Sequence, residues 1–126
     1  MTLCKSLLAI SLLASVNLAA ALEIKPYSAA ELADLQGADK PVALHFHADW
    51  CPTCRAQEKV FNGWKGDPAV PGTLLVVNYD NERELKKSMG VRSQSTLIVF
   101  KGKAETARLA GDTAPKALAN ALGSAR

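Results

Sequence analysis

Apolar residues occur along this chain in runs of strand length, separated by polar segments with a helical period. The clearest run is VALHFHA at residues 42–48, which opens after a proline and predicts a buried central strand. A second run, within GTLLVVNYD at residues 72–80, predicts another buried strand. Residues 95–110 have the pattern of two antiparallel strands joined by a turn, and residues 23–27 that of a short opening strand. The pattern therefore predicts a sheet with buried central strands.

The segments between these runs predict helices over residues 28–37, 51–61, 81–90 and 113–123. Ser28 and Glu31 have the spacing of a capping box, and Gly37 is expected to supply the left-handed residue after the end of that first helix. Glu82 and Lys86 are spaced to pair on the third helix. The order β-α-β-α-β-α-β-β-α indicates an α/β fold, with a central mixed sheet flanked by helices on both faces.

The first residues have the pattern of a secretory signal peptide. Lys5 provides a positive charge, residues 7–16 (LLAISLLASV) are apolar, and residues 19–21 offer small side chains for cleavage near Ala21. A membrane anchor is the alternative, but the apolar run is well short of the roughly 20 residues that span a bilayer. We therefore expect an exported protein with a signal peptide at 1–21 and one domain at 22–126, without stable membrane insertion after cleavage. Cys4 would be removed with the peptide.

The composition of the chain bears on which classes of partner that domain could bind. The net charge of the whole chain is only +3 at pH 7, and no basic cluster lies between aromatic residues. This balance gives no indication of binding to nucleic acid or to an anionic membrane. The domain keeps two cysteines, Cys51 and Cys54, and the loop between them is too short for a disulfide there to stabilise a fold. The two cysteines are therefore expected to form either a redox couple or half of a metal site.

The position of the pair favours redox chemistry. Cys51 is predicted at the cap of the second helix and Pro52 at its first helical position. Free N–H groups and the helix dipole at that end stabilise a thiolate, so Cys51 is expected to be the exposed attacking sulfur. Cys54, one turn further along the helix and less exposed, would resolve the mixed disulfide that Cys51 forms with a substrate.

The chain resembles the thioredoxin family. The resemblance rests on DWCPTCR after a buried strand, VVNYDNERELKKSMGVRS, TLIVFKGK and Gly111 before the last helix, and it covers residues 23–123. It implies a thioredoxin-like fold and, among exported members, a periplasmic thiol-disulfide oxidoreductase that uses no cofactor. Trp50 is expected to shape the surface where protein disulfide substrates dock, the alternative being a half-buried core aromatic.

Three departures from the family pattern concern the surroundings of the sulfurs. The family usually has a buried acid where this chain has His45, and a lysine where it has Val76. A neutral His45 could accept the proton of Cys54 during resolution, the alternative being a hydrogen-bonded core histidine. Where the family has a cis-proline, this chain has Ser95, so the preceding peptide is expected to be trans and the loop shifted.

The substrate-binding residues that we predict are Trp50, Pro52, Gln94, Ser95 and Thr96. In the family the facing loop pairs its backbone with an extended segment of the substrate, and Gln94 and Ser95 could do the same. A second hypothesis is a copper-binding metallochaperone that uses the two thiolates and an imidazole of His45 or His47. Because the spacing argues against full coordination, no resident metal is predicted.

The direction of electron flow is open in the sequence, since Pro-Thr between the cysteines does not decide the reduction potential. A reductase is favoured because the chain has no room for the helical insertion of the family's dedicated oxidants and no dimerisation domain. A disulfide donor is the alternative. A reductase in the periplasm would take electrons from a membrane thiol transporter, and we expect the protein to be a monomer.

Overall fold

The computed structural model describes residues 21–126. Its elements are β1 (Glu23–Pro26), α1 (Ala29–Gly37), β2 (Pro41–His47), α2 (Pro52–Gly63), β3 (Thr73–Asn78), α3 (Arg83–Met89), β4 (Thr96–Lys101), β5 (Ala104–Ala110) and α4 (Pro115–Gly123). This is the predicted order of strands and helices. The signal peptide prediction and Cys4 lie outside the described residues.

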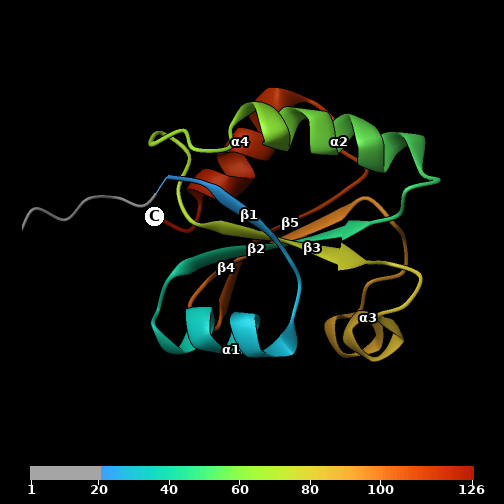
Figure 1. Ribbon diagram of the computed structural model, residues 1–126, viewed down its shortest axis with the longest axis horizontal. Helices are drawn as coiled ribbons and strands as arrows, with labels where there is room; N and C mark the ends of the chain where they lie inside the picture. Colours follow the sequence, from blue (N-terminus) through green and yellow to red (C-terminus); the bar gives the residue numbers. More distant parts are fainter. Residues whose placement is uncertain (1–20) are drawn as a thin grey trace, which may run out of the picture.

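The strands form one mixed sheet in the order β1-β3-β2-β4-β5. β1 and β2 both pair with β3 in parallel, whereas β4 pairs antiparallel with β2 and with β5. Helices α2 and α4 cover one face of the sheet and α1 and α3 the other (Figure 1). The predicted mixed sheet with helices on both faces is confirmed, and within residues 21–126 no helix is long and apolar enough to cross a membrane.

Each face of the sheet has its own core. On the α2 and α4 side, Phe61 and Leu118 pack with Ala43 and Leu97 from the strands. On the α1 and α3 side, the core is built around Phe46 and other strand residues. β2 is central and its residues from Val42 to His47 are buried, so alternate side chains of this one strand enter opposite cores. His45 and His47 share the side that α2 covers.

Several details of the helices differ from the prediction. Gly37 is the last residue of α1, and the positive φ of 56° after the helix belongs to Asp39. Lys86 lies over the ring of Tyr79, 3.7 Å from its centroid, and does not pair with Glu82, because Glu82 is the N-cap residue that precedes α3. α4 begins at Pro115, where the fixed φ of proline suits a first helical position.

Candidate active site

The two cysteines lie at the junction where β2 gives way to α2. Cys51 is the N-cap of the helix, and its Sγ accepts a hydrogen bond from the backbone N–H of Cys54 at 3.2 Å. Pro52 is the exposed first residue of the helix, a position where its missing N–H has no cost. Both thiols are free, which corresponds to the reduced state of the pair. The predicted cap position of Cys51 is confirmed.

The expectation that Cys51 is exposed is wrong for this reduced state, since only 3 % of the residue is accessible. Ala48, Cys51 and Cys54 form a small buried cluster against which Tyr79 packs. A further neighbour is Ser95, whose Oγ lies 3.2 Å from the Sγ of Cys51 and 3.1 Å from the Sγ of Cys54. The Cys51 sulfur is therefore almost fully enclosed in the reduced protein, with Ser95 of the facing loop in contact with it.

The surroundings make the two thiols unequal. Burial acts to raise the pKa of Cys51, but hydrogen bonds from the Cys54 thiol, the Ser95 hydroxyl and the N–H groups of Cys54 and Thr53 outweigh it, so this pKa lies below its ordinary value. Burial and the hydrogen bond to Cys51 both raise the pKa of Cys54. Cys51 is therefore the thiol that ionises first and Cys54 the one that keeps its proton.

His45 is a buried histidine with a side-chain partner. Its Nε2 lies 2.8 Å from Oε1 of Gln57, a helix residue with no exposed surface. The amide nitrogen of Gln57 donates to the carbonyl oxygens of Ser95 and Asp112, so its oxygen must face the histidine, and His45 carries its proton on Nε2. Burial lowers the pKa of His45 from 6.5 to about 4, which keeps the ring neutral at pH 7.

The geometry gives His45 an indirect relation to the sulfurs. Besides Ser95 and the Cys51 sulfur, the Cys54 thiol has the carbonyl oxygen of Phe46 as a partner, at 3.9 Å. His45 is connected to the pair through Gln57 and Ser95, and no hydrogen bond within residues 21–126 joins it to Cys54. Direct proton transfer from Cys54 to His45 stays a prediction.

The loop that faces the sulfurs contains Gln94, Ser95 and Thr96. Ser95 has a positive φ of 66°, and all peptide bonds from residue 21 onward are trans, as expected before Ser95. The Ser95 N–H donates to Phe46, and its carbonyl accepts from Gly111 and Gln57, so neither backbone group is available to a substrate. Thr96 is buried and its hydroxyl donates to the carbonyl of Ser93. Of the three predicted residues, only the partly exposed Gln94 has no backbone hydrogen bond within the described chain.

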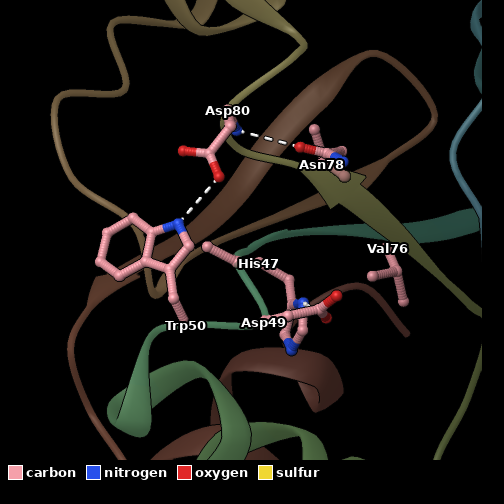
Figure 2. Close-up of a pocket in the computed structure, with 8 residues that line it drawn as sticks. His47, Asp49, Trp50, Val76, Asn78 and Asp80 are labelled. Carbon is pink, nitrogen blue, oxygen red and sulfur yellow. Dashed lines mark hydrogen bonds and ion pairs between the residues drawn. The ribbon is translucent and has the colours of Figure 1, made fainter.

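Beside the cysteines, Trp50 borders a cavity of about 310 Å³ (Figure 2). The residue is 58 % exposed, and its Nε1 donates a hydrogen bond of 2.8 Å to the Asp80 carboxylate. The cavity is further lined by His47, Ala48, Asp49, Val76, Val77 and Asn78. Trp50 belongs to none of the hydrophobic core clusters of the described residues, which argues against the alternative of a core aromatic.

The described residues do not bring together the ligands that the copper-site hypothesis requires. His47 interacts with Glu58 at 3.1 Å and with Asp49 at 3.7 Å, while the Nε2 of His45 is bonded to Gln57. Nowhere in residues 21–126 do three or more His, Cys, Asp or Glu side chains gather so that they could hold a metal ion. Both imidazoles are therefore engaged with α2 instead of the sulfurs.

The sequence analysis missed Gln57 and Asp80. Gln57 follows Cys54 by three residues, so both lie on the buried face of α2, and a glutamine at such a position requires polar partners. Its helical spacing from Cys54 was the available signal. Asp80 is 30 residues from Trp50 in sequence, and no local pattern indicates their contact.

Comparison with known proteins gives a consistent similarity. The family model described as Thioredoxin matches residues 26–124. A thioredoxin of Alicyclobacillus acidocaldarius is 36% identical over 77 residues, which are 61% of this chain and 72% of that protein. A thioredoxin of Mycobacterium tuberculosis is 29% identical over 99 residues, 79% of this chain and 85% of that protein. The crystal structure of Trxlp from Edwardsiella tarda is 34% identical with a TM-score of 0.75, covering 79% of this chain and 98% of that one.

Proposed function

Since the chain belongs to the thioredoxin family and has its fold, we propose that this thiol-disulfide oxidoreductase works as a protein-disulfide reductase of the periplasm. The observation that carries the proposal is the free Cys51–Cys54 pair at the start of α2, where hydrogen bonds lower the pKa of Cys51 while Cys54 keeps its proton. A nucleophile beside a protonated resolving thiol is the arrangement that dithiol-disulfide exchange needs.

The reaction proceeds in two exchanges. The Cys51 thiolate attacks one sulfur of a substrate disulfide, the substrate S–S bond breaks, and the departing thiolate takes a proton from water. Cys54 then loses its proton and attacks the Sγ of Cys51, which closes the Cys51–Cys54 disulfide and releases the second substrate thiol. Two electrons pass from the protein to the substrate, so the protein must be reduced again.

Substrate proteins would dock over Trp50 and the facing loop. The indole is exposed beside Cys51, and the backbone of Gln94 is available for pairing with an extended segment. Pro52, the exposed first residue of α2, follows Cys51 directly and would belong to the same docking surface. The protein would act as a monomer, with the site complete in one chain.

Two observations support reduction over oxidation. The relatives found by sequence are thioredoxins, and the described elements from β1 to α4 follow one another without an inserted helical domain. A periplasmic reductant would receive its electrons from a membrane thiol transporter. Support for export comes from the sequence pattern of residues 1–21. Leu22, which would follow the cleavage point, is buried, so the domain after that point includes it in its core.

The direct test is the reduction of insulin disulfides by the protein with dithiothreitol as the electron source. The purified chain from Leu22 onward is expected to accelerate the reaction, and the Cys51→Ser variant is expected to be inactive. The matched variant Cys4→Ser in the full chain keeps both active cysteines and should behave like wild type. Absence of acceleration by the reduced wild-type protein would contradict the proposed function.

A further inference from the structure

Ser95 is the residue of the facing loop that touches the reacting atoms. Its Oγ lies 3.2 Å from the Sγ of Cys51 and 3.1 Å from the Sγ of Cys54, and only 3 % of the residue is exposed. A hydroxyl has one hydrogen to donate and two lone pairs to accept. It can therefore donate to the Cys51 thiolate and at the same time offer a lone pair to the Cys54 thiol, whose one hydrogen also has the Cys51 sulfur and the Phe46 carbonyl as acceptors.

The backbone around Ser95 keeps the hydroxyl in that place. Ser95 has a φ of 66°, in the left-handed region where a non-glycine residue is strained. Its N–H donates to the carbonyl of Phe46 at 2.9 Å, and its carbonyl accepts from the N–H of Gly111 at 3.0 Å. These bonds join Ser95 to β2 and to the loop before α4, and they offset the strain of its backbone.

Gln57 adds a further hydrogen bond that holds the backbone of Ser95 in place. Its Nε2 donates to the carbonyl of Ser95 at 3.0 Å and to that of Asp112 at 2.8 Å, while its Oε1 accepts from His45. The side chain has no exposed surface, so each of these groups would be costly to leave unpaired. Gln57 thus connects α2, which bears the cysteines, to the loop that bears Ser95.

We propose that Ser95 is a catalytic residue whose hydroxyl bridges the two sulfurs of the reduced protein, and that Gln57 is the residue that positions it. The proposal rests on the function proposed above and adds a group to its chemistry. Before attack, the hydroxyl donates to the Cys51 thiolate. Once Cys51 has joined a substrate sulfur and lost its charge, the same hydroxyl turns to the thiolate that forms when Cys54 gives its proton to water. The second substrate sulfur takes a proton from water when it is released.

The bridge affects reduced and oxidised protein differently. In the reduced state the hydroxyl binds an anionic sulfur, and a hydrogen bond to a charged group is among the stronger ones. In the Cys51–Cys54 disulfide neither sulfur carries a charge or a proton, so that bond is largely lost. Ser95 therefore stabilises the reduced state and makes the couple less reducing than it would be without the hydroxyl.

The test compares variants that lack the hydroxyl but differ in backbone preference. Ser95→Ala and Ser95→Gly both remove Oγ, and glycine in addition accepts the positive φ without strain. Both are expected to raise the pKa of Cys51, followed by the ultraviolet absorbance of the thiolate, with a loss on the order of tenfold in the thiolate fraction below that pKa. Both should also make the couple more reducing against glutathione.

Two further variants separate positioning from packing. Gln57→Met keeps the length of the side chain without its amide and is expected to shift the thiol pKa and the potential in the same directions as Ser95→Ala, by a smaller amount. Ser93→Ala removes an exposed hydroxyl from the same loop, where it contacts only Thr96, and should leave both quantities unchanged.

Unchanged pKa and potential in Ser95→Ala and Ser95→Gly would overturn the bridge, and an unchanged pair of values in Gln57→Met would overturn its positioning role. A shift in Ser95→Ala that is absent in Ser95→Gly would assign the effect to backbone strain and also contradict the bridge. These readouts need no substrate protein, so failure of the wild-type protein to reduce insulin would count against the proposed function and not against the bridge.

Discussion

At the scale of single residues, Cys51 and Cys54 differ because their neighbours differ. Both sulfurs contact the Ser95 hydroxyl, but only the sulfur of Cys51 accepts the N–H of Cys54, whereas Cys54 has no exposed surface. One thiol is therefore stabilised as an anion and the other is kept neutral by burial. This difference sets the order in which the two cysteines act.

The order of action predicts opposite phenotypes for the two serine variants. Cys51→Ser removes the attacking thiolate, so no mixed disulfide with a substrate should form. Cys54→Ser keeps the nucleophile but cannot resolve, so it should accumulate mixed disulfides, visible as bands of higher mass on non-reducing gels that disappear on reduction. The double variant Cys51→Ser/Cys54→Ser is the control. Adducts of Cys51→Ser that form as readily as those of Cys54→Ser would reverse the assigned roles.

The low pKa of His45 predicts a dependence of stability on pH. Burial lowers this pKa from 6.5 to about 4 in the folded protein, so the unfolded chain binds a proton more readily. The contribution of His45 to the free energy of unfolding is complete above pH 6.5 and is lost as the pH falls towards 4, by roughly 3 kcal/mol in total. Urea unfolding of wild type and His45→Gln across this range should show a steeper decline for wild type.

Parallel pH profiles of the two proteins in that experiment would contradict the lowered pKa. His47 is present in both proteins, so its contribution cancels in the difference between them. The glutamine of His45→Gln cannot take up a proton. Any change in the variant's free energy of unfolding with pH therefore comes from its other titratable groups.

The redox role of the cysteine pair was predicted from the sequence, but the residues that shift the pKa values of the two thiols were predicted only in part. Cys51 and Cys54 follow a strand and begin a helix, which are local features. The contact of Ser95 with both sulfurs spans more than 40 residues, and the predicted backbone pairing at Ser95 did not take into account that Gln57 and Gly111 occupy its carbonyl. Such contacts depend on tertiary packing, for which the sequence has no periodic signal.

At the scale of elements, α1 illustrates how a local pattern fixes a boundary. Ser28 precedes the helix in an extended conformation, and its Oγ accepts the N–H of Glu31 at 3.1 Å. Only half of the predicted capping box is formed, since the carboxylate of Glu31 binds Lys25 instead of the N–H of Ser28. The helix therefore depends on the serine for its cap.

This dependence predicts the outcome of substitutions at Ser28. Ser28→Ala should lower the free energy of unfolding by about 1 kcal/mol, because a free N–H at the start of the helix loses its acceptor. Ser28→Asn keeps an acceptor of similar reach and is expected to remain close to wild type. Equal loss in both variants, measured by urea denaturation, would show that the cap does not contribute.

Two glycines, Gly37 and Gly102, are predicted to respond oppositely to alanine. Gly37 lies in α1 with open space around it, so Gly37→Ala should stabilise by about 0.5 kcal/mol through the unfolded chain. Gly102 has a φ of 57° in the turn between β4 and β5, and a Cβ there would meet Asp39. Gly102→Ala should destabilise by about 1 to 2 kcal/mol. Thermal unfolding that gives the same sign for both would contradict these conformations.

The position of Gly37 also shows that the ends of helices were harder to predict from the sequence than the helices themselves. The existence and order of strands and helices followed from apolar runs and caps, since these are local. The left-handed residue after α1 is Asp39, two positions later than predicted, and Lys86 packs on Tyr79 instead of pairing with Glu82. Both differences concern how a helix end meets the rest of the molecule.

At the scale of the whole molecule, Leu22 is the first core residue of the described chain, 2 % exposed and packed in one cluster with residues of α2 and α4. Export with cleavage near Ala21 would leave this residue at the new N-terminus. The mass of the protein recovered from the periplasm of a bacterial host is therefore expected to correspond to a start within one or two residues of Leu22. Recovery of the chain starting at Met1 would contradict the signal peptide, and Leu7→Arg, which interrupts the apolar run, should prevent processing.

The central claim is that the Cys51–Cys54 couple gives electrons to protein disulfides. The most direct measurement is the equilibrium reduction potential of this couple against glutathione, on protein starting at Leu22. We expect a reduction potential of about −250 mV or lower, in the range of thioredoxins that act as reductants. A value of about −150 mV or higher would mean that the couple donates disulfides, and it would contradict the proposed direction of electron flow.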